Sequence, residues 1–209
     1  MRISTRKNQV MIDTLLLQNA TGLTEAKPIA NLILEMILIL SGSLLIALSA
    51  QFYLPLPFSP VPITGQTFSV LLLSSLYGHK RGVLTVITYL CLGLAGNQVF
   101  ANGASGIGVI TGATGGYLLG FIPASYVVGL LSHKGWDRRI WSTAGAMIIG
   151  NGIIYVFGLL WLSQFKNILG SQTVLQAGLF PFLIGDLAKL ILATVLLPTG
   201  WKLINRHKS

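Results

Sequence analysis

Long, uncharged apolar runs are the feature that most restricts how this chain can fold. The sequence is 53% hydrophobic and only 9% charged, whereas a soluble domain usually has about 25% charged residues. A surface with so little charge needs lipid as part of its solvent. The sequence therefore predicts an all-α, polytopic integral membrane protein, in which no other stretch is long enough for a second domain.

The apolar runs predict six membrane-spanning helices. An apolar helix needs about 20 residues to cross the hydrocarbon, although buried or broken helices can be shorter. The second and third segments are short and could together form a tilted hairpin. The six segments are residues 29–52, 65–78, 82–96, 114–132, 140–163 and 178–204. We therefore expect a six-helix membrane domain over residues 29–204, between a polar N-terminal tail (1–28) and a basic C-terminal tail (205–209).

The basic residues favour six spans with both termini in the cytoplasm. In this topology every Lys and Arg except Lys166 and Lys189 falls on the cytoplasmic side, where membrane proteins concentrate these residues. The net charge of +9 is then explained by contact with anionic head groups. Nucleic acid is not an expected partner, because no basic stripe is interleaved with aromatic residues.

Several kinds of chemistry are not expected. The chain has one cysteine and three histidines that lie far apart in sequence, so we expect neither a disulfide framework nor a metal site. A phosphate-binding P-loop motif is absent, and no single span combines Ser, His and Asp. We therefore predict that the protein is not an enzyme and needs no cofactor. Energy for any transport has to come from outside the chain or from a gradient.

Two connections on the outer side have the composition of a binding surface. Residues 53–64 contain four prolines and predict a stiff, extended lid or a simple rigid connector. Residues 99–117 contain six glycines and no charge, so their backbone can approach a ligand closely. Neutral side chains such as Asn102 and Ser105 suit an amide-like or ureido-like head group better than a phosphate. The alternative for this segment is a plain flexible connector.

Charged residues within the apolar runs are the other candidates for function. Asp186 and Lys189 are spaced to share one helix face, and charges within a membrane usually face a cavity or one another. Lys189 could hold a carboxylate while Asp186 accepts an N–H, or the two could form a structural pair. Glu35 is expected to snorkel towards the membrane surface or to pair with a basic neighbour, and contact with a partner helix is the alternative. Ser43 and Ala47, at small-xxx-small spacing, predict a face for a partner helix.

Three motifs together resemble the BioY family, the biotin-binding S components of energy-coupling-factor vitamin transporters. They are "PVPITGQT" (60–67), "GLAGNQVFANGASGIGVITGATGGYLLGF" (93–121) and "IGDLAK" (184–189). This chain differs at a few positions. The family often has glycine where Asn102 stands and, in some relatives, Asn or Ser where Ala104 stands. It often has proline at the positions of Gln98, Ala113 and Ile184.

The resemblance implies a six-helix protein of the cell membrane that captures biotin from outside. It also implies assembly with a transmembrane coupling subunit and two ATPases, with Ser43 and Ala47 of the first helix facing the coupling subunit. An S component for another small carboxylate vitamin and a solitary biotin transporter are the alternatives. The implied ligand contacts are Gln66, Gly103, Gly106, Tyr117, Asp186 and Lys189, with Asn102 or Ser105 replacing the contact made at position 104.

Overall fold

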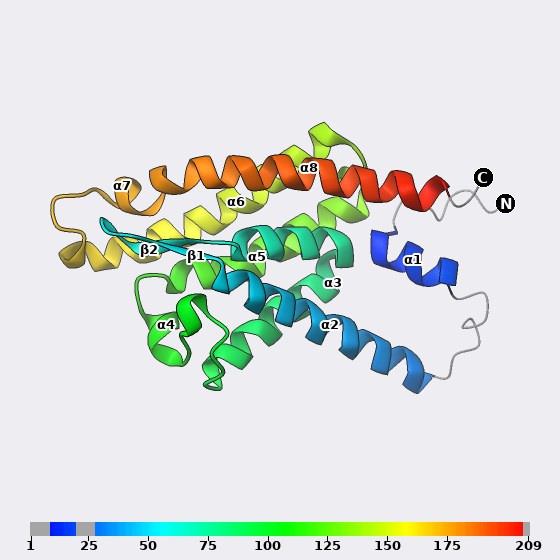
Figure 1. Cartoon of the computed structure of the whole chain (residues 1–209), viewed down its shortest axis with the longest axis horizontal. Coiled ribbons are helices and arrows are strands. Elements are labelled where there is room, and N and C mark those ends of the chain that lie inside the picture. Colours follow the sequence, from blue (N-terminus) through cyan, green and yellow to red (C-terminus); the bar gives the residue numbers. More distant parts are fainter. Residues whose placement is uncertain (1–8, 20–27, 207–209) are drawn as a thin grey trace.

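Helices formed by the apolar runs make up most of the computed structural model, which describes residues 9–19 and 28–206 (Figure 1). A β-hairpin departs from the all-α prediction. The longer helices are α1 (Met11–Asn19), α2 (Pro28–Gln51), α3 (Gln66–Leu94), α5 (Gly115–His133), α6 (Ile140–Leu162) and α8 (Leu183–Arg206). The shorter elements are β1 (Tyr53–Leu56), β2 (Ser59–Thr64), η2 (Ala101–Gly103), α4 (Ile107–Thr111), η3 (Trp136–Arg138), η4 (Ser163–Ile168), α7 (Val174–Gly178) and η5 (Phe180–Phe182).

Helix α3 is a bent helix whose two halves lie side by side. Gly78 interrupts it with φ +80° and ψ 176°, a conformation that suits glycine. The amide of Gln66 near its start donates a hydrogen bond to the hydroxyl of Tyr89 near its end, which a straight helix could not allow. The two halves correspond to the predicted segments 65–78 and 82–96, and they form the hairpin that the short lengths suggested.

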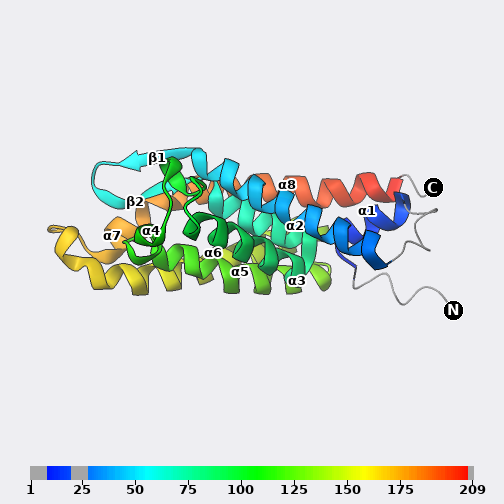
Figure 2. The ribbon, with the colours of Figure 1, turned by 90° about the horizontal axis from the view of Figure 1, so that it is seen from below.

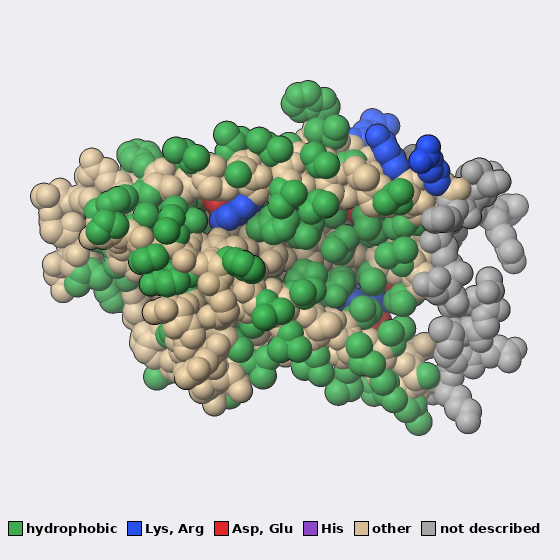
Figure 3. Space-filling view, viewed as in Figure 1, with side chains coloured by type: hydrophobic (Ala, Val, Ile, Leu, Met, Phe, Trp, Pro, Cys, Tyr) green, Lys and Arg blue, Asp and Glu red, His purple; other side chains and the backbone are tan. Residues whose placement is uncertain are grey.

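Four helical stretches among the described residues are long and apolar enough to cross a membrane: 29–51, 115–133, 140–168 and 174–206. Their outward faces are apolar. Leu32, Met36 and Leu40 of α2 and Ile184, Leu187 and Ile191 of α8 are all exposed. Apolar side chains spread over much of the molecular surface in Figure 3. Such faces are compatible with lipid rather than water, so the chain is a multi-pass membrane protein.

The two ends of the molecule differ. Figures 1 and 2 place the β-hairpin and α7 at one end, which we call the hairpin end, and α1 with the last turn of α8 at the other. We call the second the basic end. Among the described residues, every Lys and Arg except Lys166 and Lys189 belongs to the basic end, on the bend of α3, on the α5–α6 connection around η3, or on the last turns of α8.

Helix α1 lies within the segment expected to be a polar tail. Val10 and Met11 are buried, and the helix contacts α3 and α8. The Arg81 guanidinium binds both Asp13 of α1 and Glu35 of α2. The predicted pairing of Glu35 with a basic neighbour is therefore confirmed. The remainder of the expected tail, residues 1–8 and 20–27, lies outside the described residues, as do residues 207–209.

A buried carboxylate joins the α5–α6 connection to α8 at the basic end. Asp137 is 1% exposed and accepts a hydrogen bond of 2.6 Å from the indole N–H of Trp201. The Arg138 guanidinium lies 4.4 Å from the centre of the Trp201 ring. Burial raises the pKa of Asp137 to about 6, although the Trp201 hydrogen bond and the charges of Arg138 and His133 oppose this shift.

The small residues of α2 face the inside of the molecule, which corrects the prediction of a partner-facing stripe. Ser43 is 0% and Ala47 is 8% exposed. The Ser43 hydroxyl donates to the backbone oxygen of Thr85 in α3 at 2.9 Å. Small residues permit close helix contact, but their spacing does not specify the partner. Here the partner is the second half of α3 in the same chain.

Candidate ligand-binding site

A cavity of about 300 Å³ lies towards the hairpin end of the helix bundle. Its walls come from β2, the start of α3, the segment between α3 and α5, the face of α5, the middle of α6, and the η5–α8 region. The lining residues are Pro60, Val61, Pro62, Thr64, Gln66, Thr67, Phe100, Ala101, Ala104, Gly108, Val109, Gly112, Ala113, Thr114, Tyr117, Leu118, Phe121, Asn151, Ile154, Tyr155, Phe182, Asp186 and Lys189. Segments far apart in the sequence therefore meet around one space.

The charged part of this cavity is an ion pair on the first turns of α8. The Lys189 ammonium lies 3.0 Å from one carboxylate oxygen of Asp186, which confirms that the two share a helix face. The ammonium also donates to the Thr67 hydroxyl at 2.9 Å, and the Tyr155 hydroxyl donates to the other oxygen of Asp186. The charges cancel locally, and each carboxylate oxygen has a partner.

Gln66 contributes a fixed amide to the cavity wall. It is buried, and its side-chain oxygen accepts a hydrogen bond of 2.9 Å from the Thr64 hydroxyl. Its amide nitrogen donates to Tyr89, whose hydroxyl in turn donates to the backbone oxygen of Val99 at 3.3 Å. This network joins β2, both halves of α3 and the segment that follows α3.

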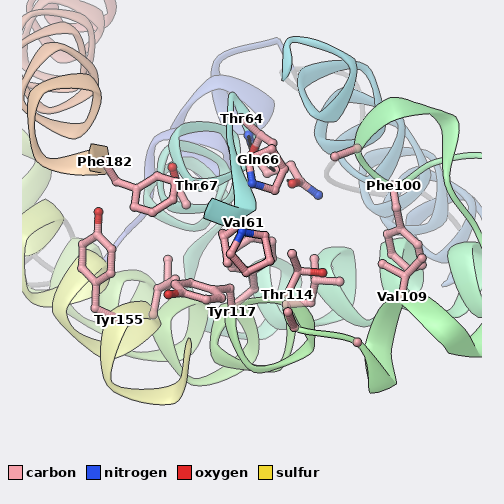
Figure 4. A pocket seen from close by; sticks show the side chains of 18 of the residues that line it. Val61, Thr64, Gln66, Thr67, Phe100, Val109, Thr114, Tyr117, Tyr155 and Phe182 are labelled. Carbon is pink, nitrogen blue, oxygen red and sulfur yellow. Dashed lines mark hydrogen bonds between the residues drawn. The ribbon is translucent and has the colours of Figure 1, made fainter. Parts of the chain in front are cut away.

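Apolar side chains form most of the remaining wall. In Figure 4, Tyr155 and Phe182 lie at one side of the cavity and Phe100 and Val109 lie at the other. Tyr117 lies between these groups, and its hydroxyl donates to the backbone oxygen of Gly178 at 2.8 Å. The arrangement fits a ligand that has a flat or aliphatic body and few polar groups, as is usual for small-molecule sites.

The β-hairpin formed by residues 53–64 contributes to the cavity wall through Pro60, Val61, Pro62 and Thr64 of β2. Strands β1 and β2 pair antiparallel, with Tyr53 opposite Thr64 and an irregularity between Leu54 and Leu56. Proline cannot donate a ladder hydrogen bond, so it is tolerated at sheet edges, at positions where no such bond is needed. The Ser59 hydroxyl donates to the backbone oxygen of Ala177 at 2.7 Å. The hairpin is thereby tied to α7 across the hairpin end.

The glycine-rich segment contributes other residues than those predicted. Asn102, Gly103, Ser105 and Gly106 are not among the cavity-lining residues, whereas Ala101, Ala104, Gly108 and Gly112 are. Asn102 is exposed and has φ +59°. Asparagine tolerates this left-handed conformation better than most side chains, which explains why it can stand where the family often has glycine.

Gln51, Asn151 and Tyr155 are among the polar residues of the site region that the sequence analysis missed. Gln51 holds the glycine-rich segment, because its amide donates to the backbone oxygen of Phe100 at 3.1 Å and accepts from the N–H of Gly103 at 3.1 Å. Asn151 and Tyr155 lie one turn apart on α6 and both line the cavity. The available signal was the presence of polar side chains inside an otherwise apolar span.

No group of three or more His, Cys, Asp or Glu side chains within residues 9–19 and 28–206 could hold a metal ion. The groups that face the cavity are instead hydroxyls, amides, one carboxylate and one ammonium.

Comparison with known proteins gives a consistent set of relatives. The model of the BioY family matches residues 19–206. The biotin transporter BioY of Thermotoga maritima is 39% identical over 144 residues, which cover 69% of this chain and 83% of the relative. The biotin transporter BioY2 of Lactococcus lactis is 35% identical over 161 residues, covering 76% of this chain and 85% of the relative.

A solved structure has the same fold. The S-component for biotin from an ECF-type ABC transporter superposes with a TM-score of 0.72 and 25% sequence identity. The match covers 85% of this chain and 95% of that protein. The helix arrangement described above is therefore the arrangement of an S component.

Proposed function

Because the chain belongs to the BioY family, we propose that it is a membrane-embedded biotin-binding subunit that mediates biotin uptake. The observation that supports this most directly is the cavity, which has one neutral, hydrogen-bonding side and mainly apolar walls. Its volume of about 300 Å³ is at the lower limit of small-molecule sites, about 300–1,000 Å³. Members of the family are transporters, and the protein is not an enzyme.

The ion pair favours one orientation of the ligand. A carboxylate placed against Lys189 would also face the carboxylate of Asp186, 3.0 Å away from the ammonium, and would add net negative charge to a buried region. The ureido group of biotin is neutral and has both N–H and C=O groups. We therefore place the ureido ring at Asp186 and Lys189, and the valerate carboxylate towards the opening of the cavity.

The proposed contacts extend along the cavity from this end. Lys189 donates to the ureido oxygen, and Gln66 and Tyr117 border the bicyclic ring. The backbone around Gly103 and Gly106, with Asn102 and Ser105, forms the outer edge through which the ligand enters. None of these four residues lines the cavity as it stands, so the assignment depends on movement of the segment.

We also propose the membrane topology. Helix α2, the two halves of α3, and helices α5, α6 and α8 make six crossings, with the basic end in the cytoplasm. The concentration of Lys and Arg at that end supports the orientation. The ligand cavity then opens towards the outside, where biotin is captured.

ATP-driven transport requires partners. The structural relative belongs to an ECF-type ABC transporter, so we propose assembly with a transmembrane coupling subunit and two ATPase subunits. The exposed apolar stripe of α2 that includes Leu32, Met36 and Leu40 is the proposed coupling face, in place of the buried Ser43 and Ala47. Uptake of labelled biotin by cells with and without the coupling module distinguishes this assembly from a solitary transporter.

Calorimetry on the purified protein in detergent tests the proposed ligand. Biotin is expected to bind with one-to-one stoichiometry and to outcompete other small carboxylate vitamins, such as lipoate, pantothenate and nicotinate. Absence of heat with biotin, or tighter binding of another member of this panel, would contradict the proposal.

A further inference from the structure

Asn151 is a polar residue of the cavity wall, and its side-chain oxygen is the atom of interest. It lies in the middle of α6 and lines the cavity with Ile154 and Tyr155, which lie three and four residues further along the same helix face. Its side-chain oxygen is buried and has no hydrogen-bond donor among the described residues. Buried polar groups without a partner are uncommon in folded proteins, and each one calls for an explanation.

Lys189 lines the same cavity as Asn151 and offers the complementary group. The Lys189 ammonium has three N–H donors, of which one goes to Asp186 and one to Thr67. One donor therefore remains for a ligand. Both oxygens of Asp186 already have partners inside the protein. The wall thus presents an acceptor without a donor on Asn151 and a spare donor on Lys189.

A buried water is the simplest competing explanation. A second, small cavity of about 10 Å³ is bordered by Asn151, Thr67 and Lys189, and this volume is close to the minimum that one water needs. A water there would satisfy the Asn151 oxygen with no contribution to ligand binding. The Asn151 oxygen has less than 1 Å² exposed, so it meets a ligand only when the side chain turns towards the large cavity, which Asn151 also lines.

We infer that Asn151 is a specificity-determining contact whose side-chain oxygen accepts a ureido N–H of biotin while Lys189 donates to the adjacent ureido oxygen. The inference rests on the proposed function and goes beyond it by naming a residue that recognises one hydrogen of the ligand. A cyclic urea carries N–H and C=O groups side by side. It therefore supplies both a donor for the Asn151 oxygen and an acceptor for the Lys189 ammonium. An ester or thioester at this position would leave the Asn151 oxygen without a donor.

Two substitutions test the contact. Asn151→Leu removes the amide at similar volume, and Asn31→Leu is the matched control, because Asn31 is exposed on α2 and does not line the cavity. Calorimetry in detergent is expected to show biotin affinity reduced about 10- to 100-fold for Asn151→Leu and unchanged for Asn31→Leu. The thermal midpoint of the ligand-free Asn151→Leu protein should not fall, since a buried amide without a partner has been replaced by an apolar group.

Modified ligands show whether the effect comes from the N–H itself. Biotin methylated on one or the other ureido nitrogen lacks one donor at a time. One of the two derivatives should bind wild-type protein much more weakly than biotin, yet Asn151→Leu should add little to that loss, because both changes remove the same hydrogen bond. Asn151→Ala serves as a second variant should the leucine variant fail to fold.

The outcomes separate the inference from the proposed function. Wild-type affinity for biotin in both Asn151 variants overturns the inference and leaves the proposed function standing. Equal losses for biotin and for both methylated derivatives also overturn it, and indicate a structural water. Failure of the wild-type protein to bind biotin overturns both.

Discussion

Replacing Lys189 by methionine is the perturbation with the most specific expected result. The substitution keeps an unbranched side chain of similar length and removes the ammonium that lies 3.0 Å from Asp186. The side chains of Lys189 and Asp186 are only 21% and 11% exposed, so the remaining carboxylate is poorly solvated. Removing one partner of a buried ion pair costs about 3–5 kcal/mol, and partial exposure places this pair near the lower limit.

The expected loss of stability is therefore about 3 kcal/mol, which corresponds to a fall of roughly 6–12 °C in the thermal midpoint of a chain of this size. Biotin affinity should fall about 10- to 100-fold, because a hydrogen bond from a charged donor is lost. The double variant Asp186→Asn/Lys189→Met has no unpaired charge. It should recover most of the stability but none of the affinity.

Thermal unfolding and calorimetry in one detergent measure both quantities. Lys202→Met is the matched control, because Lys202 is an exposed lysine near the end of the same helix, and neither quantity should change. The reasoning is refuted if Lys189→Met keeps wild-type affinity. It is also refuted if the double variant is as unstable as the single one, since the cost would then not arise from an unpaired carboxylate.

Three further predictions concern parts of the scaffold outside the cavity. The pKa of Asp137 is raised from 3.8 to about 6, so the folded state holds a proton that the unfolded state has lost, and stability decreases as the pH rises from about 4 to about 6. Asp137→Asn should remove this slope in pH-dependent unfolding and be more stable by about 3 kcal/mol at pH 7.5; an unchanged slope would contradict the assignment. Gly116→Ala should destabilise strongly in a thermal melt, because the added methyl would lie 2.1 Å from Trp161 and 2.6 Å from the backbone oxygen of Phe157, whereas Gly152→Ala, which meets nothing within 4 Å, should not. Arg81→Met removes the pairs with Asp13 and Glu35 and should increase hydrogen exchange in α1 with little effect on biotin binding; unaltered protection of residues 11–16 would show that these pairs do not hold α1.

The helices could be predicted from the sequence because apolar runs and charge clusters determine them directly. The predicted segments 114–132 and 140–163 correspond to α5 and α6 within one residue at each end. The last segment was placed too early, because residues 174–182 form α7 and η5 before α8 begins. Asp186 and Lys189 consequently lie in the first turns of their helix. Apolar composition does not distinguish a span from a short helix that caps it.

The β-hairpin was missed because its sequence contains four prolines, which normally argue against strands. The pairing of β1 with β2 depends on tertiary position at an edge, where the missing N–H groups cost little. The sequence nevertheless singled out this segment, since a stiff run of prolines joins two predicted spans, and its strand β2 lines the cavity.

Side-chain direction accounts for the other differences. In the glycine-rich segment no regular period exists, so the sequence could not show that Ala104 and Gly108 face the cavity while Asn102 and Ser105 do not. The spacing of Ser43 and Ala47 correctly placed them on one face of α2. The sequence did not determine whether that face points to the inside of the molecule or to a partner. Asp186 and Lys189 were identified because charge within an apolar run is rare and costly. Asn151 is also a polar residue within an apolar run, but it is uncharged, so it is a weaker indication of a functional site.

The structure of the protein with bound biotin, determined in lipid or detergent, tests the central claim most directly. The account predicts biotin in the cavity between β2, α5, α6 and α8, with the ureido oxygen within hydrogen-bonding distance of the Lys189 ammonium and the valerate carboxylate towards the hairpin end. Biotin bound elsewhere, or bound with its carboxylate against Lys189 and Asp186, would contradict it.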